Sequence, residues 1–305
     1  MSILDKIKLQ TTPSGRRPPA AVELAPEGVL AASISASGAA PVLAYAALPA
    51  GALVPGISEA NLRAPEAVAN ALRSALDQVS PRTRSVSVVL PDTSARVFVL
   101  DFDTLPTKAA EVLPVLRFRL RRVAPFDVEQ SAVSYQVLSQ QRDSVKVLAT
   151  VIPFTILDEY ESAIRAAGYE SGSVLPSALA SLAATDVAEP LLAANLNDTS
   201  LTTAITRDND LLLYRTIELP AEPSERLAEV QRGIAVAAAY FEDRLGIPPM
   251  QLHYAGTAAT SEFVQAVAHT QLPVTEIAPA PATGAITTLG PIGFAGVAGA
   301  LAGAA

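Results

Sequence analysis

The chain has 305 residues, of which 50% are apolar, and its formal net charge is −8. That length and apolar content are sufficient for two domains with substantial cores. The acidic balance and the scarcity of aromatic residues argue against a nucleic-acid-binding protein, which needs a cationic footprint. The absence of cysteine excludes disulfides, thiolate metal sites and a thiol nucleophile, and we predict no metal site.

Neither end of the chain has the features of a membrane segment. Charged residues interrupt the apolar residues of MSILDKIKLQ, so no secretory signal is expected there. The composition of residues 1–19 predicts a flexible tail, in which a single amphipathic turn could contact a partner or lipid. The apolar C-terminal run is about fifteen residues long, whereas roughly twenty are needed to span a bilayer. We therefore expect a cytoplasmic protein without direct membrane insertion.

The first third of the chain predicts a small antiparallel sheet followed by a helix. Apolar runs at 20–26 and 29–35 are separated by Glu27-Gly28, which is a hairpin signal. A third short strand is expected at 42–48. Apolar residues then recur at helical spacing over 64–79, which predicts an amphipathic helix.

The middle third predicts a mixed α+β unit. Alternating apolar residues predict strands on both sides of Pro91-Asp92, and Pro125 ends a helix that we expect over 106–123. The elements expected after it are strands at 132–138 and 145–152, a helix at 155–167, a short strand at 173–175 and a helix that begins at Pro176.

The last third repeats the pattern of the first. Strands are expected at 191–196, 201–206 and 211–219, and a long helix follows. The apolar stripe of that helix is Leu227, Val230, Ile234, Ala237, Ala238, Phe241 and Leu245. Further expected elements are a strand at 250–256, a helix at 260–269, a strand at 272–277 and a C-terminal helix. Strands that alternate with helices in this way predict a layered α/β core.

The organisation resembles the actin-like ATPase fold, and more specifically the PilM family of type IV pilus assembly proteins. The resemblance is carried by SVSVVLPD, VFVLDFDTLP, LRFRLRRVAPFDVEQSAVSYQVL and YESAIRAAGYESGSVLPSALASL in the middle third. LLLYRTIELP followed by VQRGIAVAAAYFEDRLG resembles the family's strand and long helix in the last third. No single motif is decisive, but their order and spacing make chance similarity improbable.

The resemblance implies a two-lobed actin-like (ribonuclease H-like) fold with an α+β subdomain inserted in the first lobe. The expected division is a tail at 1–19, a first lobe at 20–184 that includes an inserted subdomain at 85–184, a second lobe at 185–290, and a C-terminal helix at 291–305 that packs on the core.

The resemblance also implies a function and a location. PilM-like proteins are cytoplasmic scaffolds of the pilus machinery that bind the cytoplasmic N-terminal tail of PilN, an inner-membrane protein. We expect such a PilN-like partner, contacts with other pilus assembly components, a role in twitching motility, and a location at the inner face of the inner membrane through partners. The alternatives are an active ATP-binding switch or ATPase of the same fold, and an actin-like component of type II secretion or cell division.

Two loops correspond to the family's phosphate loops, in which Asp-Ile-Gly and hydroxyl residues hold the phosphates of ATP with magnesium. In the first, Glu23 takes the place of the Asp, Ala25 that of the Gly, and Pro26 removes a backbone donor. In the second, NLNDTS, Asn195 replaces the carboxylate, and Asp198, Thr199 and Ser200 retain polarity. A neutral Asn cannot serve as a general base. ATP binding with magnesium is therefore conceivable, but efficient hydrolysis is not expected.

A third loop and one surface complete the candidate residues. The adenosine loop of the family has paired glycines, where this chain has Gly256 and Thr257; Gly256 either lets the backbone approach a nucleotide or forms a strand-to-helix turn. For partner binding, the resemblance and the charge pattern suggest Val86 and Val88 beside a peptide groove, and Arg117 and Arg121 in an arginine-rich helix end. That helix end could equally complement the helix dipole.

Overall fold

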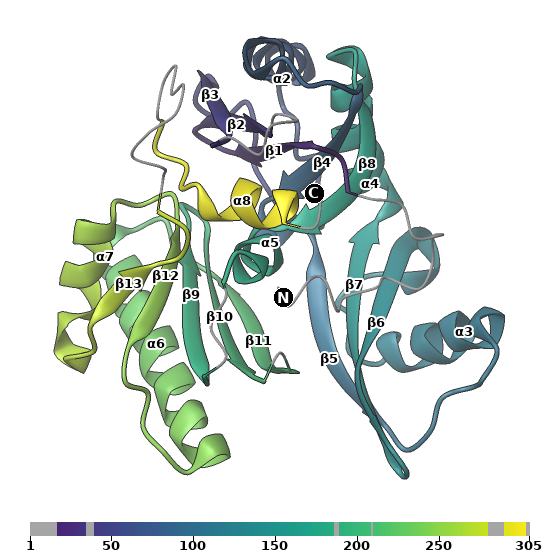
Figure 1. Cartoon of the computed structure of the whole chain (residues 1–305), viewed down its shortest axis with the longest axis vertical. Coiled ribbons are helices and arrows are strands. Elements are labelled where there is room, and N and C mark those ends of the chain that lie inside the picture. The colour runs from purple at the N-terminus through teal and green to yellow at the C-terminus, as the bar shows by residue number, and fades with distance from the viewer. Residues whose placement is uncertain (1–16, 35–39, 186–188, 209, 280–289, 303–305) are drawn as a thin grey trace.

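The computed structural model describes residues 17–34, 40–185, 189–208, 210–279 and 290–302. Within these ranges the chain forms two lobes, each on a five-stranded sheet, and a smaller unit on a three-stranded sheet (Figure 1). The expectations for the tail at 1–16, including its amphipathic turn, fall outside the described residues.

The first lobe has the strand order β3-β2-β1-β4-β8. Its strands are β1 (Ala20–Ala25), β2 (Gly28–Ser33), β3 (Val42–Ala47), β4 (Ser85–Leu90) and β8 (Glu170–Pro176). β1 to β3 form an antiparallel meander, and β4 and β8 continue the sheet in parallel with β1. Helices α2 (Pro65–Val79) and α4 (Phe154–Ala166) cover one face, and α5 (Ser177–Ala183) and α8 (Ala295–Leu301) cover the other. Every residue of β1 and β2 is consequently buried.

The second lobe repeats this topology with the strand order β11-β10-β9-β12-β13. Its strands are β9 (Leu191–Leu196), β10 (Ser200–Arg207), β11 (Asp210–Glu218), β12 (Leu252–Gly256) and β13 (Val274–Glu276). Helices α6 (Pro223–Leu245) and α7 (Thr260–Val267) pack on one face of the sheet, and the short 3₁₀ turn η3 (Ala268–Thr270) follows α7. Again a meander of three strands is followed by two parallel ones, so the two lobes are built on the same plan.

The smaller unit is inserted between β4 and α4. It consists of β5 (Arg96–Phe102), α3 (Ala109–Leu120), β6 (Ser131–Gln141) and β7 (Ser144–Pro153), with the 3₁₀ turns η1 (Asp92–Ser94) and η2 (Val128–Gln130). Its sheet, β5-β7-β6, is separate, and α3 packs on it through Val112, Leu116 and Leu120. The sequence analysis placed the whole of 85–184 in this subdomain, but β4 and β8 pair in the first-lobe sheet because their buried side chains belong to that core. The separate unit is therefore 96–153.

Most elements occur where the sequence predicts them, and the differences have local causes. The helix expected at 106–123 is only Ala109–Leu120, because Lys108 has an extended backbone and the N–H groups of Arg122 and Val123 bond three residues back, to the carbonyls of Arg119 and Leu120, as in a turn. The strand expected at 173–175 extends over Glu170–Pro176, because it pairs along β4. Leu227, expected in the apolar stripe of α6, is 44% exposed.

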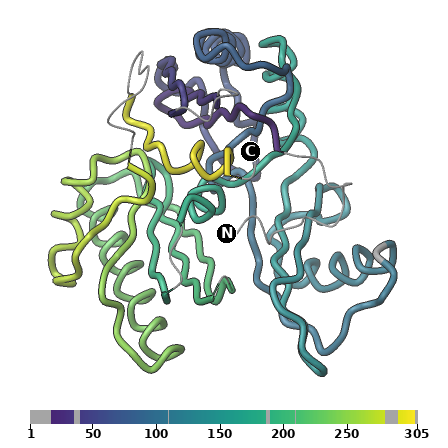
Figure 2. Tube along the Cα trace, in the orientation of Figure 1, coloured from purple at the N-terminus to yellow at the C-terminus, as the bar shows by residue number. Residues whose placement is uncertain are grey.

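The C-terminal segment returns from the second lobe to the first (Figure 2). Helix α8 crosses α5 so closely that a Cβ added at Gly299 would overlap the Ala180 carbonyl. Two crossing helices of small residues thus join the lobes. Among the described residues, no helix is both long and apolar enough to cross a bilayer.

Candidate functional site: the cleft between the lobes

The turn between β1 and β2 is a two-residue connection, Pro26-Glu27, with Ala25 opposite Gly28. Pro26 has no N–H to offer a ligand. The carbonyl of Glu27 accepts a hydrogen bond of 2.6 Å from the Tyr45 hydroxyl. An added Cβ at Gly28 would overlap the Tyr45 ring, so this glycine is required by close packing on β3. The first candidate phosphate loop is therefore a packed hairpin with few free donors.

The Glu27 side chain faces the second lobe. Burial raises the pKa of this carboxyl, and the nearby Asp198 carboxylate raises it further, while hydrogen bonding from the Thr257 side chain and the charge of Arg226 lower it. One of its oxygens, Oε2, is buried without a hydrogen-bond partner among the described residues. The Glu27 carboxylate of the first lobe thus lies near Asp198 and Thr257, which belong to two loops of the second lobe, in the space between the lobes.

The turn between β9 and β10 is closed by the side chain of Asn197. Its Oδ1 accepts hydrogen bonds from the backbone N–H groups of Thr199 at 3.1 Å and Ser200 at 2.9 Å, and from both hydroxyls. Arg226, from the first turn of α6, pairs with the Asp198 carboxylate at 3.0 Å and donates to the Asn197 carbonyl at 3.0 Å. Backbone N–H groups in a turn are the donors that a phosphate needs, and here an Asn side chain already occupies them.

The turn between β12 and α7 brings Gly256 against β9. Gly256 has a φ of +144°, and an added Cβ would overlap the carbonyl of Leu196. The Thr257 N–H donates to that carbonyl at 3.0 Å, and the Gly293 N–H donates to the Gly256 carbonyl at 3.0 Å. Gly256 therefore forms the turn from β12 to α7, and its close contact is with the carbonyl of Leu196 in the same chain.

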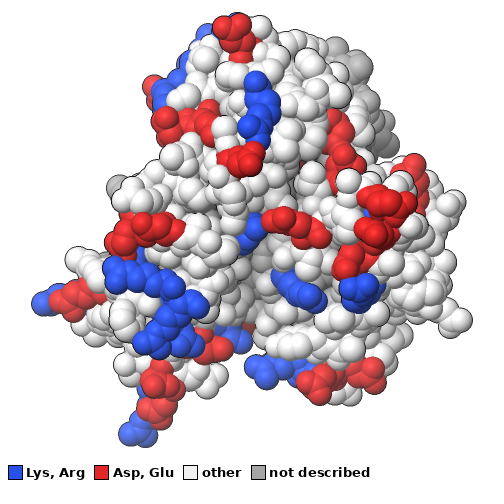
Figure 3. All heavy atoms as spheres, turned by 180° about the vertical axis from the view of Figure 1, so that it is seen from behind, with Lys and Arg blue, Asp and Glu red and all other residues white. Residues whose placement is uncertain are grey.

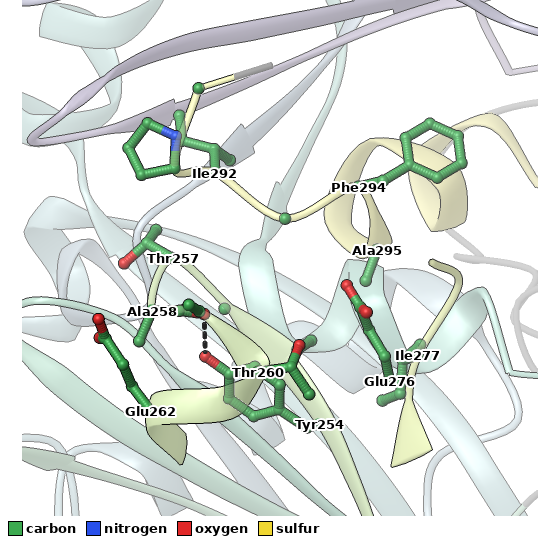
Figure 4. Close-up of a pocket in the computed structure, with 16 residues that line it drawn as sticks. Tyr254, Thr257, Ala258, Thr260, Glu262, Glu276, Ile277, Ile292, Phe294 and Ala295 are labelled. Atoms are coloured by element: carbon green, nitrogen blue, oxygen red, sulfur yellow. Dashed lines mark hydrogen bonds between the residues drawn. The ribbon is translucent and has the colours of Figure 1, made fainter. Parts of the chain in front are cut away.

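A cavity of about 500 Å³ lies beside this turn, between β12, the end of β13 and residues 290–295 (Figure 4). Its floor includes Tyr254, whose hydroxyl donates to the Ala258 carbonyl at 2.8 Å. Among the described residues, the charged side chains of its lining are Glu262 and Glu276, with no Lys or Arg. Two carboxylates without a cation disfavour a polyphosphate in this cavity.

A buried polar network joins the two lobes below these loops. Glu23 Oε1 accepts a hydrogen bond of 2.6 Å from the Ser177 hydroxyl at the start of α5, and Asn195 donates to the same hydroxyl at 3.0 Å. Glu23 is fully buried, and its second oxygen has no partner among the described residues. Burial raises the pKa of this carboxyl to about 7, and the charge of Asp92 adds to the effect. Glu23 is thus held inside the protein by Ser177 and is not displayed to a ligand.

Asp92 is the second buried carboxyl of this network. It accepts hydrogen bonds from the Ala178 N–H at 3.0 Å, the Thr202 hydroxyl at 2.9 Å and the Tyr214 hydroxyl at 3.1 Å. Burial raises the pKa of Asp92 to about 6, although the three hydrogen bonds act to lower it. The acceptor belongs to the first lobe, while its donors come from α5 and from the second lobe, so Asp92 holds the lobes together.

The structure brings together the seven residues that the sequence suggests for nucleotide binding, but most of their polar groups bond within the protein. These residues are Glu23, Asn195, Asp198, Thr199, Ser200, Gly256 and Thr257. Among the described residues, no group of three or more carboxylate or histidine side chains is arranged to hold a metal.

The suggested partner-binding residues are corrected in part. Val86 and Val88 are 0% and 1% exposed in the centre of β4, so neither can contact a partner. Arg117 donates to the carbonyls of Val128 and Ser131, and Arg121 pairs with Glu129 at 2.6 Å. These two arginines therefore stabilise the inserted subdomain.

Sequence reasoning missed Asp92, Ser177 and Arg226. Two signals were available. Asp92 follows directly on a buried strand, and Arg226 lies in the first turn of a helix, where a cation opposes the helix dipole and so indicates a specific partner. Ser177 carries no local signal, because its importance depends on groups from both lobes.

Comparison with known proteins identifies the fold. No protein-family model matches the chain, and no curated protein matches it in sequence. Among solved structures, it is similar to the PilM–PilN type IV pilus biogenesis complex, with a TM-score of 0.72 and 17% identity over 95% of this chain and 100% of that one. It is also similar to the cytoplasmic domain of EpsL, an inner-membrane component of the type II secretion system of Vibrio cholerae, with a TM-score of 0.51 and 16% identity over 92% of both chains.

At these identities the similarity establishes the fold. The repeated sheet topology, the two crossing helices and the unit inserted after β4 agree with it. The expectation of a two-lobed α/β structure is confirmed: the chain has the actin-like fold, in the form that it shares with PilM.

Proposed function

We propose that this chain is a cytoplasmic scaffold of type IV pilus assembly, which binds the cytoplasmic N-terminal tail of a PilN-like inner-membrane protein and hydrolyses ATP weakly or not at all. The observation that carries the proposal is an actin-like fold whose interlobe loops use most of their polar groups in bonds within the chain. The similarity along the whole chain to a PilM that was solved with PilN supports the choice of partner.

The argument against efficient ATP hydrolysis rests on charge and on donors. Glu27 and Asp198 bring carboxylates to the place where a polyphosphate would lie. At an effective dielectric constant of about 20, two unit charges about 4 Å apart interact by about 4 kcal/mol, so like charges there weaken binding substantially. The N–H groups of Thr199 and Ser200 are held by Asn197, and Asn195 is not a base.

Within this proposal, the tail docks in a groove between α2 and α4 of the first lobe. The groove has a volume of about 680 Å³, and its lining includes Leu62, Ala69 and Ala163 as an apolar floor. Its rim carries the carboxylates of Glu66, Asp158 and Glu159 and the guanidinium of Arg73, which donates to the Ala166 carbonyl. Cytoplasmic segments next to transmembrane helices are enriched in Lys and Arg. An apolar tail with basic residues therefore suits both floor and rim.

Calorimetry with a synthetic peptide of the tail tests both the binding and its place. The peptide is taken from the PilN-like protein encoded beside this chain. Ser162→Trp, on the rim of the groove, is expected to weaken binding at least about tenfold, which is about 1.4 kcal/mol. Ser74→Trp, exposed on α2 but outside the groove, is the matched control and should bind like the parent. No binding at high micromolar peptide contradicts the scaffold; equal binding by both variants contradicts only the groove.

An active nucleotide switch of the same fold is the second candidate, and calorimetry with Mg-ATP separates the two. We expect no tight binding. Tight binding that is lost on Asp198→Ala would favour the switch. The similarity to EpsL leaves a type II secretion counterpart as a further alternative, and binding of a tail from that system, in place of the pilus tail, would identify it.

A further inference from the structure

The solvent face of α3 carries an unusual row of apolar side chains. Ala110, Pro114 and Phe118 lie at positions i, i+4 and i+8, and all three are exposed. Phe118 is 59% exposed, and Val123, in the turn after the helix, is 48% exposed. The opposite face of α3 is fixed in the core of the inserted subdomain. The outer face is therefore partly apolar, and it cannot turn into the core, because the opposite face of α3 is packed there.

Arginines flank this outer face, and only some of them have partners. Arg117 and Arg121 bond within the subdomain. Arg119 and Arg122 are exposed and form no hydrogen bond or ion pair with their side chains among the described residues, although the Arg122 guanidinium lies 5.0 Å from the centre of the Phe118 ring. Figure 3 shows several Lys and Arg side chains on the inserted subdomain, at the left of that view, with Asp and Glu side chains beside them. Exposed cations without a carboxylate partner, on a chain of net charge −8, indicate an anionic partner.

The apolar side chains of this surface distinguish between anionic partners. Arginine clusters recognise acidic peptide motifs as well, but the exposed Phe118 and Val123 side chains of this face are apolar and offer such a motif no polar contact. A helix with basic and exposed aromatic side chains suits the plane of an anionic membrane, where rings enter the headgroup region and arginines contact lipid phosphates. Such a set lies at the C-terminal end of α3 and in the turn after it, and consists of Phe118, Arg119, Arg122 and Val123.

We propose that these four residues, the α3 patch, are a peripheral membrane contact that binds the headgroups of acidic phospholipids. The contact requires no membrane-spanning segment. It goes beyond the proposed scaffold function, because it places the inserted subdomain directly on the lipid surface instead of leaving the partner tail as the sole link to the membrane. Each Lys or Arg near an anionic surface contributes about 1 kcal/mol, which is about fivefold in partition.

The absence of tryptophan from the chain provides a local reporter. Phe118→Trp in the purified full chain places its single tryptophan in the patch, and excitation at the red edge of the absorption band selects it over the tyrosines. Its emission should shift to the blue with vesicles of phosphatidylglycerol and phosphatidylethanolamine in equal parts, and should not shift with phosphatidylcholine vesicles. Adding Arg119→Ala and Arg122→Ala is expected to weaken the partition about 30-fold, and high salt should weaken it as well.

The matched control adds Arg82→Ala and Arg244→Ala, which removes two exposed arginines outside the α3 patch and should leave the partition within about twofold of the Trp variant. Co-sedimentation of the parent chain and of Phe118→Ala with the same vesicles repeats the test without the reporter. No shift with anionic vesicles overturns the proposal. A shift with polyglutamate but not with vesicles also overturns it, in favour of an acidic protein partner. Neither assay includes the partner tail, so the outcome is independent of the scaffold proposal.

Discussion

Replacing Glu23 by Gln is expected to stabilise the protein, and to do so only at neutral and alkaline pH. Burial and the charge of Asp92 raise the pKa of this carboxyl from 4.5 to about 7 in the folded chain. Between these values the folded state keeps a proton that the unfolded chain has released, so the free energy of unfolding falls as the pH rises through this window. Each tenfold change in proton affinity corresponds to about 1.4 kcal/mol, and the full penalty above pH 7 is therefore about 3 kcal/mol.

Gln resembles the protonated acid in shape and can still accept the hydrogen bond from Ser177. We expect Glu23→Gln to raise the free energy of unfolding by about 3 kcal/mol near pH 8 and to change it little near pH 4.5. Urea unfolding followed by far-UV circular dichroism at both pH values measures the difference. Glu262→Gln, at an exposed position, is the control and should be neutral at both. Destabilisation near pH 8, or the same change at both pH values, would refute the reasoning about burial.

Two further predictions concern the backbone of the cleft and the α3 patch. Gly256→Ala should destabilise the chain by roughly 1–3 kcal/mol, because an added Cβ overlaps the Leu196 carbonyl and the φ of Gly256 is +144°. Urea unfolding measures this free energy, and a neutral result would contradict the close contact. In α3, Leu116→Ala should cost about 2–5 kcal/mol and Phe118→Ala less than about 0.5 kcal/mol, because one side chain is buried and the other exposed. Equal costs in the same assay would contradict the assignment of the two faces.

The sequence predicts the succession of strands and helices well, because that succession depends on local periodicity. The meander of β9 to β11, for example, follows from apolar runs bounded by Asn-Asp and Asp-Asn turns. Periodicity does not reveal which strands share a sheet. The resemblance to a known family led us to group β4 and β8 with the inserted subdomain, whereas their partners in the structure are β1 and each other.

The candidate site likewise divides into features that residue types predict and features that depend on packing. Once the resemblance places Pro26 and Asn195 in loops that correspond to phosphate loops, the residue types alone indicate poor substitutes, since a missing donor and a missing base are properties of single residues. Whether a polar residue is free to act depends on what packs against it. Arg117 and Arg121 illustrate this, because the sequence marks all four arginines of the helix end alike, and only the fold separates those with internal partners from Arg119 and Arg122.

The sequence by itself determined the layered α/β character of this protein and the duplication of its strand pattern. Each of these depends on the type and spacing of nearby residues. Only the tertiary structure decided that Glu27 lies against both loops of the second lobe and that Glu23 is buried with Ser177. Glu23 and Ser177 are 154 positions apart, and Glu27 is farther still from its neighbours in the second lobe. Such contacts form only when the whole chain packs, which is why the cleft is occupied by the protein's own side chains.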